Sequence, residues 1–133
     1  MKAIILGVFM LFITNPAKTD KEAITTTLNY YMNGSMNRDF NTLKKAFHED
    51  AIMTILREGK LQQVNAREFF SKMKPGEPLK RTNTIVSIDV AVDTAIARLK
   101  IEDDTKIFHD FMTLQKMNGR WYIVNKSFHR EQK

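Results

Sequence analysis

The fold is decided by residues 108–129, FHDFMTLQKMNGRWYIVNKSFH. Strand-forming aromatic and β-branched residues lie on both sides of Asn118-Gly119, a dipeptide typical of a two-residue turn between antiparallel strands. The pattern predicts strands from Lys106 to Lys116 and from Trp121 to His129, joined as a β-hairpin. The residues that precede this hairpin decide the rest of the architecture.

The register of this hairpin stays open at the level of sequence. A strict two-residue turn places Asp110 opposite Ser127, whereas a bulge of one residue brings Lys126 or Phe128 opposite. A carboxylate among aromatic residues is costly unless it is paired or neutral. If Lys126 pairs with Asp110, the ion pair is structural rather than catalytic.

The residues before the hairpin supply helices first and strands afterwards. Helical spacing of apolar residues, capping residues and Gly34 as a C-cap candidate indicate two helices and a third, short one. Period-two alternation indicates the strands. The predicted helices are 19–34, 38–47 and 66–72, and the predicted earlier strands are 51–56, 60–64, 86–92 and 95–101. This order predicts an α+β domain with the helices packed on one curved antiparallel sheet.

Length and charge narrow the function classes. A chain of 133 residues has room for one domain, and its 43% hydrophobic content supports a real core. The net charge is +6, but Lys and Arg occur in runs no longer than two and are mixed with acidic residues. A solvated basic surface explains this better than a nucleic-acid site. With no cysteine, disulfides and thiolate metal sites are excluded.

The N-terminus is typical of a secretory signal peptide. Lys2 is followed by the apolar run Ala3–Ile13, and a small residue, Ala17, follows the break at Pro16. The run is too short for a membrane span, which needs about 20 residues. We therefore expect a signal peptide at 1–17, a domain at 18–133, and an exported protein (periplasmic or extracellular) with no stable membrane anchor after cleavage.

Familiar catalytic and cofactor motifs do not occur. The five glycines are isolated, so there is no phosphate-binding loop. The three histidines lie far apart in sequence, which argues against a metal site. His48 follows Phe47, where an imidazole commonly caps the end of a helix. We expect no cofactor, no metal and no catalytic residue identifiable by motif.

The chain resembles the nuclear-transport-factor-2-like superfamily, and within it the bacterial group labelled putative lumazine-binding. Three features carry the resemblance: Tyr31-x-x-Gly34, Phe47-x-x-Asp50-Ala51, and residues 110–126 with their Asn-Gly turn. It covers about residues 20 to 130. The resemblance implies a cone-shaped α+β barrel, also called cystatin-like, with a pocket between sheet and helices, and usually a homodimer.

Comparison with the ketosteroid isomerases of this superfamily implies roles for three positions. Tyr31 and Asp110 stand where those enzymes place a phenol and a protonated carboxyl group that stabilise an oxyanion. Ile55 stands at their general-base position. An isoleucine cannot accept a proton, so the isomerase mechanism lacks its central step.

We therefore expect a protein that binds a small, partly apolar molecule, without established catalysis. The expected ligand-binding residues are Tyr31, Phe47, Ile55, Phe70, Asp110, Met112, Lys126 and Phe128. One alternative is an isomerase, dehydratase or cyclase with a base such as His48 or His109. Another is an interaction module whose outer sheet face binds a protein.

Overall fold

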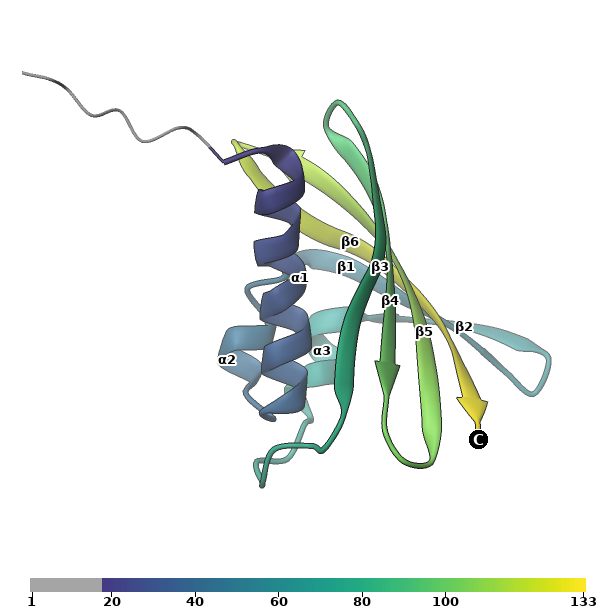
Figure 1. Cartoon of the computed structure of the whole chain (residues 1–133). Helices are drawn as coiled ribbons and strands as arrows, with labels where there is room; N and C mark the ends of the chain where they lie inside the picture. The colour runs from purple at the N-terminus through teal and green to yellow at the C-terminus, as the bar shows by residue number, and fades with distance from the viewer. Residues whose placement is uncertain (1–17) are drawn as a thin grey trace, which may run out of the picture.

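The computed structural model describes residues 18–133, and the predicted signal peptide at 1–17 lies outside the described residues. Figure 1 shows α1 standing against one face of a curved sheet, with the two short helices beside its lower half. No helix within residues 18–133 is long and apolar enough to cross a membrane. The elements are α1 Asp20–Met36, α2 Phe40–Leu43, β1 Phe47–Arg57, β2 Lys60–Asn65, α3 Ala66–Ser71, β3 Thr82–Ala91, β4 Thr94–Glu102, β5 Lys106–Met117 and β6 Arg120–Gln132.

The strands form one open sheet in the order β2-β1-β6-β5-β4-β3. All neighbours are antiparallel except β1 and β6, which run parallel. The parallel pair arises because the chain leaves β2 for the far edge at β3 and returns strand by strand to lie beside β1. The predicted cone-shaped α+β fold is confirmed, with a sheet that is mostly antiparallel and does not close.

Helix α1 begins as the sequence predicts. The Thr19 side chain accepts a hydrogen bond from the Glu22 amide at 3.2 Å, and the Glu22 carboxylate accepts one from the Thr19 amide at 3.4 Å. This reciprocal capping box satisfies two of the amides that a helix N-terminus leaves free. The helix then buries Ile24, Leu28 and Tyr31 along the face that packs on the sheet.

The expected helix end at Gly34 is wrong, since α1 continues to Met36 and is capped by Asn37. Gly34 serves a different purpose. A Cβ atom built on it would lie 2.5 Å from the backbone nitrogen of Leu43 and 2.7 Å from the Leu43 Cα. Glycine therefore allows α2 to pack directly against the backbone of α1.

The second helix is also shorter than predicted. It covers only Phe40–Leu43, and Phe47 is the first residue of β1 instead of the last of a helix. Phe47 pairs with Ile123 of β6 and is fully buried. Sheet pairing and burial thus override the helical spacing of residues 40–47.

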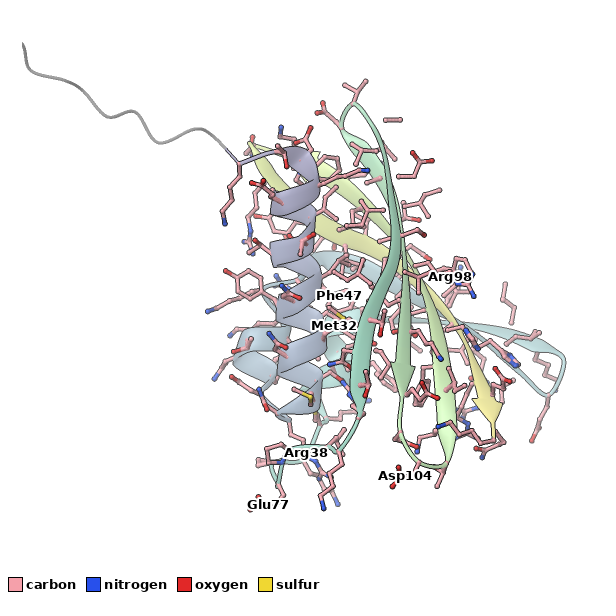
Figure 2. All side chains as sticks on the ribbon, in the orientation of Figure 1. Met32, Arg38, Phe47, Glu77, Arg98 and Asp104 are labelled. Carbon is pink, nitrogen blue, oxygen red and sulfur yellow. The ribbon has the colours of Figure 1, made fainter. Side chains whose placement is uncertain are left out.

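The core lies between α1 and the concave face of the sheet. Met32 and Phe47 lie in this layer in Figure 2, whereas Arg98 points from the opposite face. Even-numbered residues of β5 and odd-numbered residues of β4 face the helices. The largest fully buried side chain is Trp121, whose indole Nε1 donates to Asp20 at the start of α1 over 3.1 Å. This hydrogen bond joins the start of α1 to β6.

The predicted turn at Asn118-Gly119 is confirmed. Asn118 has φ 51° and Gly119 has φ 75°, the left-handed pair that a two-residue hairpin turn needs. Glu58 and Gly59 adopt the same conformation between β1 and β2, with φ 51° and 73°. Both hairpins therefore have tight turns, and Asn118, Gly119 and Gly59 suit these conformations better than Glu58 does.

Candidate functional site

A bulge in β6 determines which side chains of the last hairpin face the helices. Leu114 pairs with Ile123 and Thr113 with Asn125, which leaves Val124 as an extra residue on β6. Such a bulge shifts the alternation of faces by one position. The inward set changes from odd-numbered residues before Val124 to even-numbered residues after it.

Beyond the bulge, Asp110 pairs with Phe128 and Met112 pairs with Lys126. Directly opposed residues of an antiparallel pair point to the same face. Lys126 and Phe128 therefore join Asp110 on the inner face, and Ser127 does not. Of the two registers that the sequence allows, the bulged one is found.

Asp110 is fully buried and accepts two hydrogen bonds. The Tyr31 hydroxyl of α1 donates to its Oδ2 at 2.7 Å, and the Lys126 ammonium donates to its Oδ1 at 3.0 Å. Tyr31 is 4% exposed and Lys126 is 3% exposed. A buried charge is tolerated when it is paired and hydrogen-bonded, and both conditions are met here.

This triad of Tyr31, Asp110 and Lys126 does not present the paired donors implied by the isomerase resemblance. The Tyr31 O–H bond is directed at Asp110, and Asp110 accepts from both neighbours instead of donating. Lys126 is the member that retains free donors, since an ammonium carries three hydrogens. The hydrogen-bonding group turned toward a ligand is therefore a cation.

Burial shifts the pKa values of Tyr31 and Lys126, the two residues that donate to Asp110. Burial raises the pKa of Tyr31 well above its ordinary 10.0, and the negative charge of Asp110 raises it further. Burial lowers the pKa of Lys126 from 10.5, while the attraction of Asp110 opposes that shift. Tyr31 is thus a neutral phenol throughout the physiological range.

A cavity of about 230 Å³ opens beside the triad, between the helices and the sheet. Its wall is mostly aromatic and aliphatic. Apart from Tyr31, its polar groups are the Ser35 hydroxyl and the cations Arg81 and Lys126. It is lined by Tyr31, Ser35, Met53, Phe69, Phe70, Arg81, Ile101, Phe108, Lys126 and Phe128. We call it the central cavity.

The aromatic rings of the central cavity pack on one another and on the triad. Phe70 lies 5.9 Å from Tyr31 between ring centroids, and Phe108 lies 6.1 Å from Phe128. The Lys126 ammonium lies 3.8 Å from the centroid of the Phe128 ring, a close cation–π contact. The cation is thereby held against an apolar wall.

Arg81 enters the central cavity from the residue before β3. Its Nη2 donates to the carbonyl oxygen of Met32 at 3.4 Å, a long hydrogen bond. Its Nε is buried and has no hydrogen-bond partner. Burial lowers the pKa of Arg81 from 12.5, although the arginine stays charged. Asn83 donates to the same Met32 carbonyl, also at 3.4 Å.

The predicted ligand-binding residues fall into three groups. Tyr31, Phe70, Lys126 and Phe128 line the central cavity. Asp110, Phe47 and Met112 are fully buried beneath that lining. Ile55 lines a second hollow of about 520 Å³, formed with Phe108, Phe128 and the β1–β2 turn.

Six lining residues were not predicted from the sequence: Ser35, Met53, Phe69, Arg81, Ile101 and Phe108. Strand alternation would have placed Ile101 and Phe108 on the inner face with Leu99 and Asp110. Arg81 gave no such signal, because it precedes its strand and is charged. Its position depends on the return of the chain from α3 to the far edge of the sheet.

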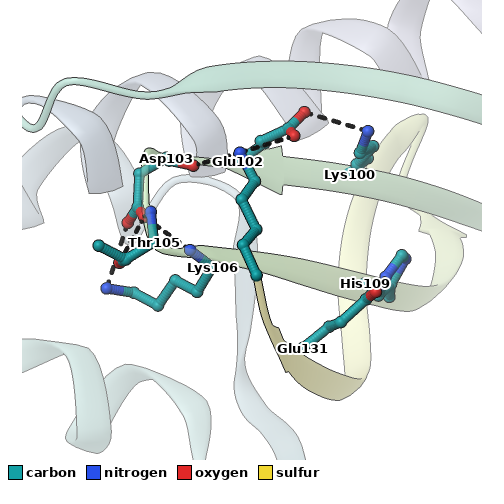
Figure 3. Close-up of polar contacts among 8 residues, drawn as sticks. Lys100, Glu102, Asp103, Thr105, Lys106, His109 and Glu131 are labelled. Atoms are coloured by element: carbon teal, nitrogen blue, oxygen red, sulfur yellow. Dashed lines mark hydrogen bonds and ion pairs between the residues drawn. The ribbon is translucent and has the colours of Figure 1, made fainter.

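Neither histidine proposed as a base lines the central cavity. His109 lies on the outer face of β5, and its Nε2 is 2.7 Å from Glu131, as Figure 3 shows. His48 lies in β1 rather than at a helix end, and its ring packs edge-on against Tyr122 at 5.8 Å. The expectation that His48 caps a helix is therefore wrong.

One group of possible metal ligands lies outside the cavity. His48, Glu49 and Asp50 offer ligand atoms that all lie within 4.8 Å of one another. The His48 Nδ1 already accepts the Asp50 amide at 3.2 Å, and both carboxylates are exposed. Exposed acidic groups commonly stand close together without an ion, so the expected absence of a metal centre stays a prediction.

The comparisons with known proteins agree with the fold. The model of the Putative lumazine-binding family matches residues 19–129, most of the chain. The chain belongs to this family, within the nuclear-transport-factor-2-like superfamily. The matched segment contains every residue of the triad and of the central cavity. A search of curated proteins found no match.

Several solved structures resemble this member of the Putative lumazine-binding family. An NTF2-like protein of unknown function from Shewanella baltica OS155 is 25% identical, with a TM-score of 0.79, over 88% of this chain and 100% of that one. One from Methylobacillus flagellatus KT is 29% identical, with a TM-score of 0.75, over 87% and 95%. A ketosteroid isomerase-like protein from Erwinia carotovora atroseptica SCRI1043, 12% identical over 81% and 93%, has a TM-score of 0.65 and supports the fold alone.

Proposed function

We propose that this protein binds a compact, mostly apolar small molecule in the central cavity. The observation that carries the proposal is a cavity of about 230 Å³ with aromatic walls and a few convergent polar groups, Ser35, Arg81 and Lys126. Sites for small molecules have this make-up: a largely apolar surface with a few placed polar groups that set orientation.

The size of the cavity limits the ligand. Drug-sized molecules occupy sites of about 300–1,000 Å³, so the central cavity suits a smaller ring system. A third hollow, different from the one that Ile55 lines and also of about 520 Å³, shares Ser35, Phe69 and Phe70 with the central cavity. A ligand with a ring in the central cavity can therefore extend a substituent past Phe69 toward solvent.

The family description supplies the first compound to test. Lumazine is a flat molecule of two fused rings, and a flat ring can pack against the phenylalanine side chains that line the cavity. We treat it as a probe and propose binding of a small ring compound as the function.

The test is native mass spectrometry of the domain purified from its own host, followed by titration with lumazine. We expect a co-purifying or added small molecule at one per chain. A filled-cavity variant, Ser35→Phe, should lose it, whereas Asn29→Phe on the exposed part of the same helix should keep it. A domain that stays empty with both sources of ligand would contradict the proposal.

Catalysis receives no support from the residues around the central cavity. Among the described residues that line it, only Lys126 and Tyr31 are candidates for proton transfer, and both are bonded to Asp110. Ile55 replaces the general base implied by the isomerase resemblance. The proposal of binding without catalysis rests on these residues, and export and a homodimer remain predictions.

A further inference from the structure

The charges around the central cavity do not balance. Lys126 and Asp110 neutralise each other through their contact at 3.0 Å. Tyr31 is an uncharged phenol. Arg81 is the second cation of the lining, and no ion pair among the described residues includes it. The lining therefore carries one uncompensated positive charge.

The carboxylates that attract Arg81 are already engaged by other groups. Asp110 attracts it more strongly than Asp103 does, and Asp110 is bonded to Tyr31 and Lys126. Figure 3 shows Asp103 facing its own turn, where it accepts the Thr105 amide at 2.8 Å and pairs with Lys106 at 3.2 Å. The folded chain thus leaves Arg81 without a carboxylate of its own.

The hydrogen bonds of Arg81 are also incomplete. An arginine has five N–H donors, and within residues 18–133 this side chain donates to the Met32 carbonyl at 3.4 Å. The buried Nε has none. An unpaired buried donor on a charged group costs more than a satisfied one, which leaves a place for an acceptor from outside the chain.

We propose that the ligand of the central cavity carries one anionic group, of the carboxylate class, and that Arg81 binds it. This inference rests on the proposed function and adds the charge of the ligand to it. The guanidinium fork matches a planar carboxylate. The ring of the ligand then lies among Phe70, Phe108 and Phe128, and Lys126, whose charge Asp110 balances, can donate a further hydrogen bond.

The experiment compares two probes of the same shape, naphthoate and naphthamide, by isothermal titration calorimetry. A charge-assisted hydrogen bond in a buried site favours the anion by about tenfold or more. We therefore expect naphthoate to bind at least about tenfold more tightly than naphthamide. Arg81→Gln should remove this preference, so that naphthoate binds no more tightly than naphthamide, and the circular dichroism spectrum of the variant shows whether it folds.

Two further variants sharpen the test. Lys80→Gln removes the same charge from the adjacent, exposed residue and should keep the preference for naphthoate. Arg81→Lys keeps the positive charge but loses the planar guanidinium group. It should keep part of the preference for naphthoate. Equal binding of both probes to the unaltered protein would overturn the anion inference and leave the binding proposal standing. Failure of both probes, and of the smaller pair benzoate and benzamide, would overturn both.

Discussion

Lys126 and Asp110 pair at 3.0 Å although they are not directly opposed in the β5–β6 ladder. Asp110 faces Phe128, and Lys126 faces Met112, so the two charges are diagonal neighbours on one face of the sheet. Only the bulge at Val124 brings them to that face together. A backbone irregularity in one strand thereby creates the polar centre of the molecule.

Because the two charges are buried together, removing either one alone should destabilise the folded protein. Asp110→Asn should lower the free energy of unfolding by about 3 kcal/mol, because the buried Lys126 ammonium loses its counter-charge. Lys126→Met should cost a similar amount, since it leaves the carboxylate unpaired. Urea unfolding followed by circular dichroism measures both.

The double variant Asp110→Asn with Lys126→Met removes both charges and keeps an acceptor for Tyr31. We expect it to be more stable than the sum of the single losses predicts, by about 1 kcal/mol or more. Strictly additive losses would mean that the two charges do not interact, and the structural role of the pair would have to be abandoned.

Tyr31 makes stability depend on alkaline pH. Its pKa is raised above 10.0 in the folded state, so its contribution is complete below pH 10 and is lost as pH rises through the folded value. In an ultraviolet titration we expect one tyrosine to ionise only when the chain unfolds. Tyr31→Phe should abolish that late step, and a late step that persists in this variant would assign it to another tyrosine.

The main features of the fold are visible in the sequence because each is locally encoded. The capping residue Thr19 starts the first helix, and the Asn118-Gly119 turn sets the last hairpin. Alternation identifies the inner face of β4. These signals act over a few residues and agree with the packing, so the element order and the α+β class follow from them.

The site is less visible because it depends on pairing between distant segments. The bulge that turns Lys126 inward has no signature in its own residues. Arg81 reaches the cavity only because β3 occupies the far edge of the sheet. Gly34 suggests a helix end by itself, and its real role, close contact with Leu43, requires knowledge of where α2 packs.

Gly34 gives a prediction of its own. Gly34→Ala should favour the helix by about 1 kcal/mol from propensity alone, but its Cβ would lie 2.5 Å from the Leu43 nitrogen. Separating the two helices costs about 1–3 kcal/mol, so we expect a net loss of stability in urea unfolding. Asn29→Ala, on the exposed part of α1, should be neutral or stabilising. A stabilised Gly34→Ala protein would refute the close packing.

Asp103 should make the turn between β4 and β5 sensitive to acid. Hydrogen bonds from Thr105 and contact with Lys106 hold the pKa of Asp103 well below its ordinary 3.8. Its contribution is therefore present above pH 3.8 and declines as pH falls toward the folded value.

Thermal melts across the acid range measure this effect. We expect Asp103→Asn to lower Tm at neutral pH, and the difference from the unaltered protein to shrink below pH 3.8. The neighbouring Asp104 is exposed and provides a matched control with the same change of charge. Equal effects of Asp103→Asn and Asp104→Asn would show that net charge, and not the turn, is responsible.

The predicted homodimer has a candidate surface on the outer face of the sheet. Val86, Ile96 and Phe111 project from three adjacent strands there and are 49%, 55% and 49% exposed. Single exposed apolar side chains are normal on a protein surface, but three on one face form a group. A second copy of the sheet would cover them. A charge at the centre of such an interface opposes association.

Phe111→Glu should therefore shift the protein from dimer to monomer in size-exclusion chromatography with light scattering. Leu61→Glu places the same charge at an exposed apolar position on the β1–β2 hairpin, 66% exposed, and should leave the dimer intact. Because Phe111 points away from the central cavity, the monomer should still bind the ligand. A protein that is monomeric before any substitution would show the dimer prediction to be wrong, and a dimer that survives Phe111→Glu would move the interface to another face.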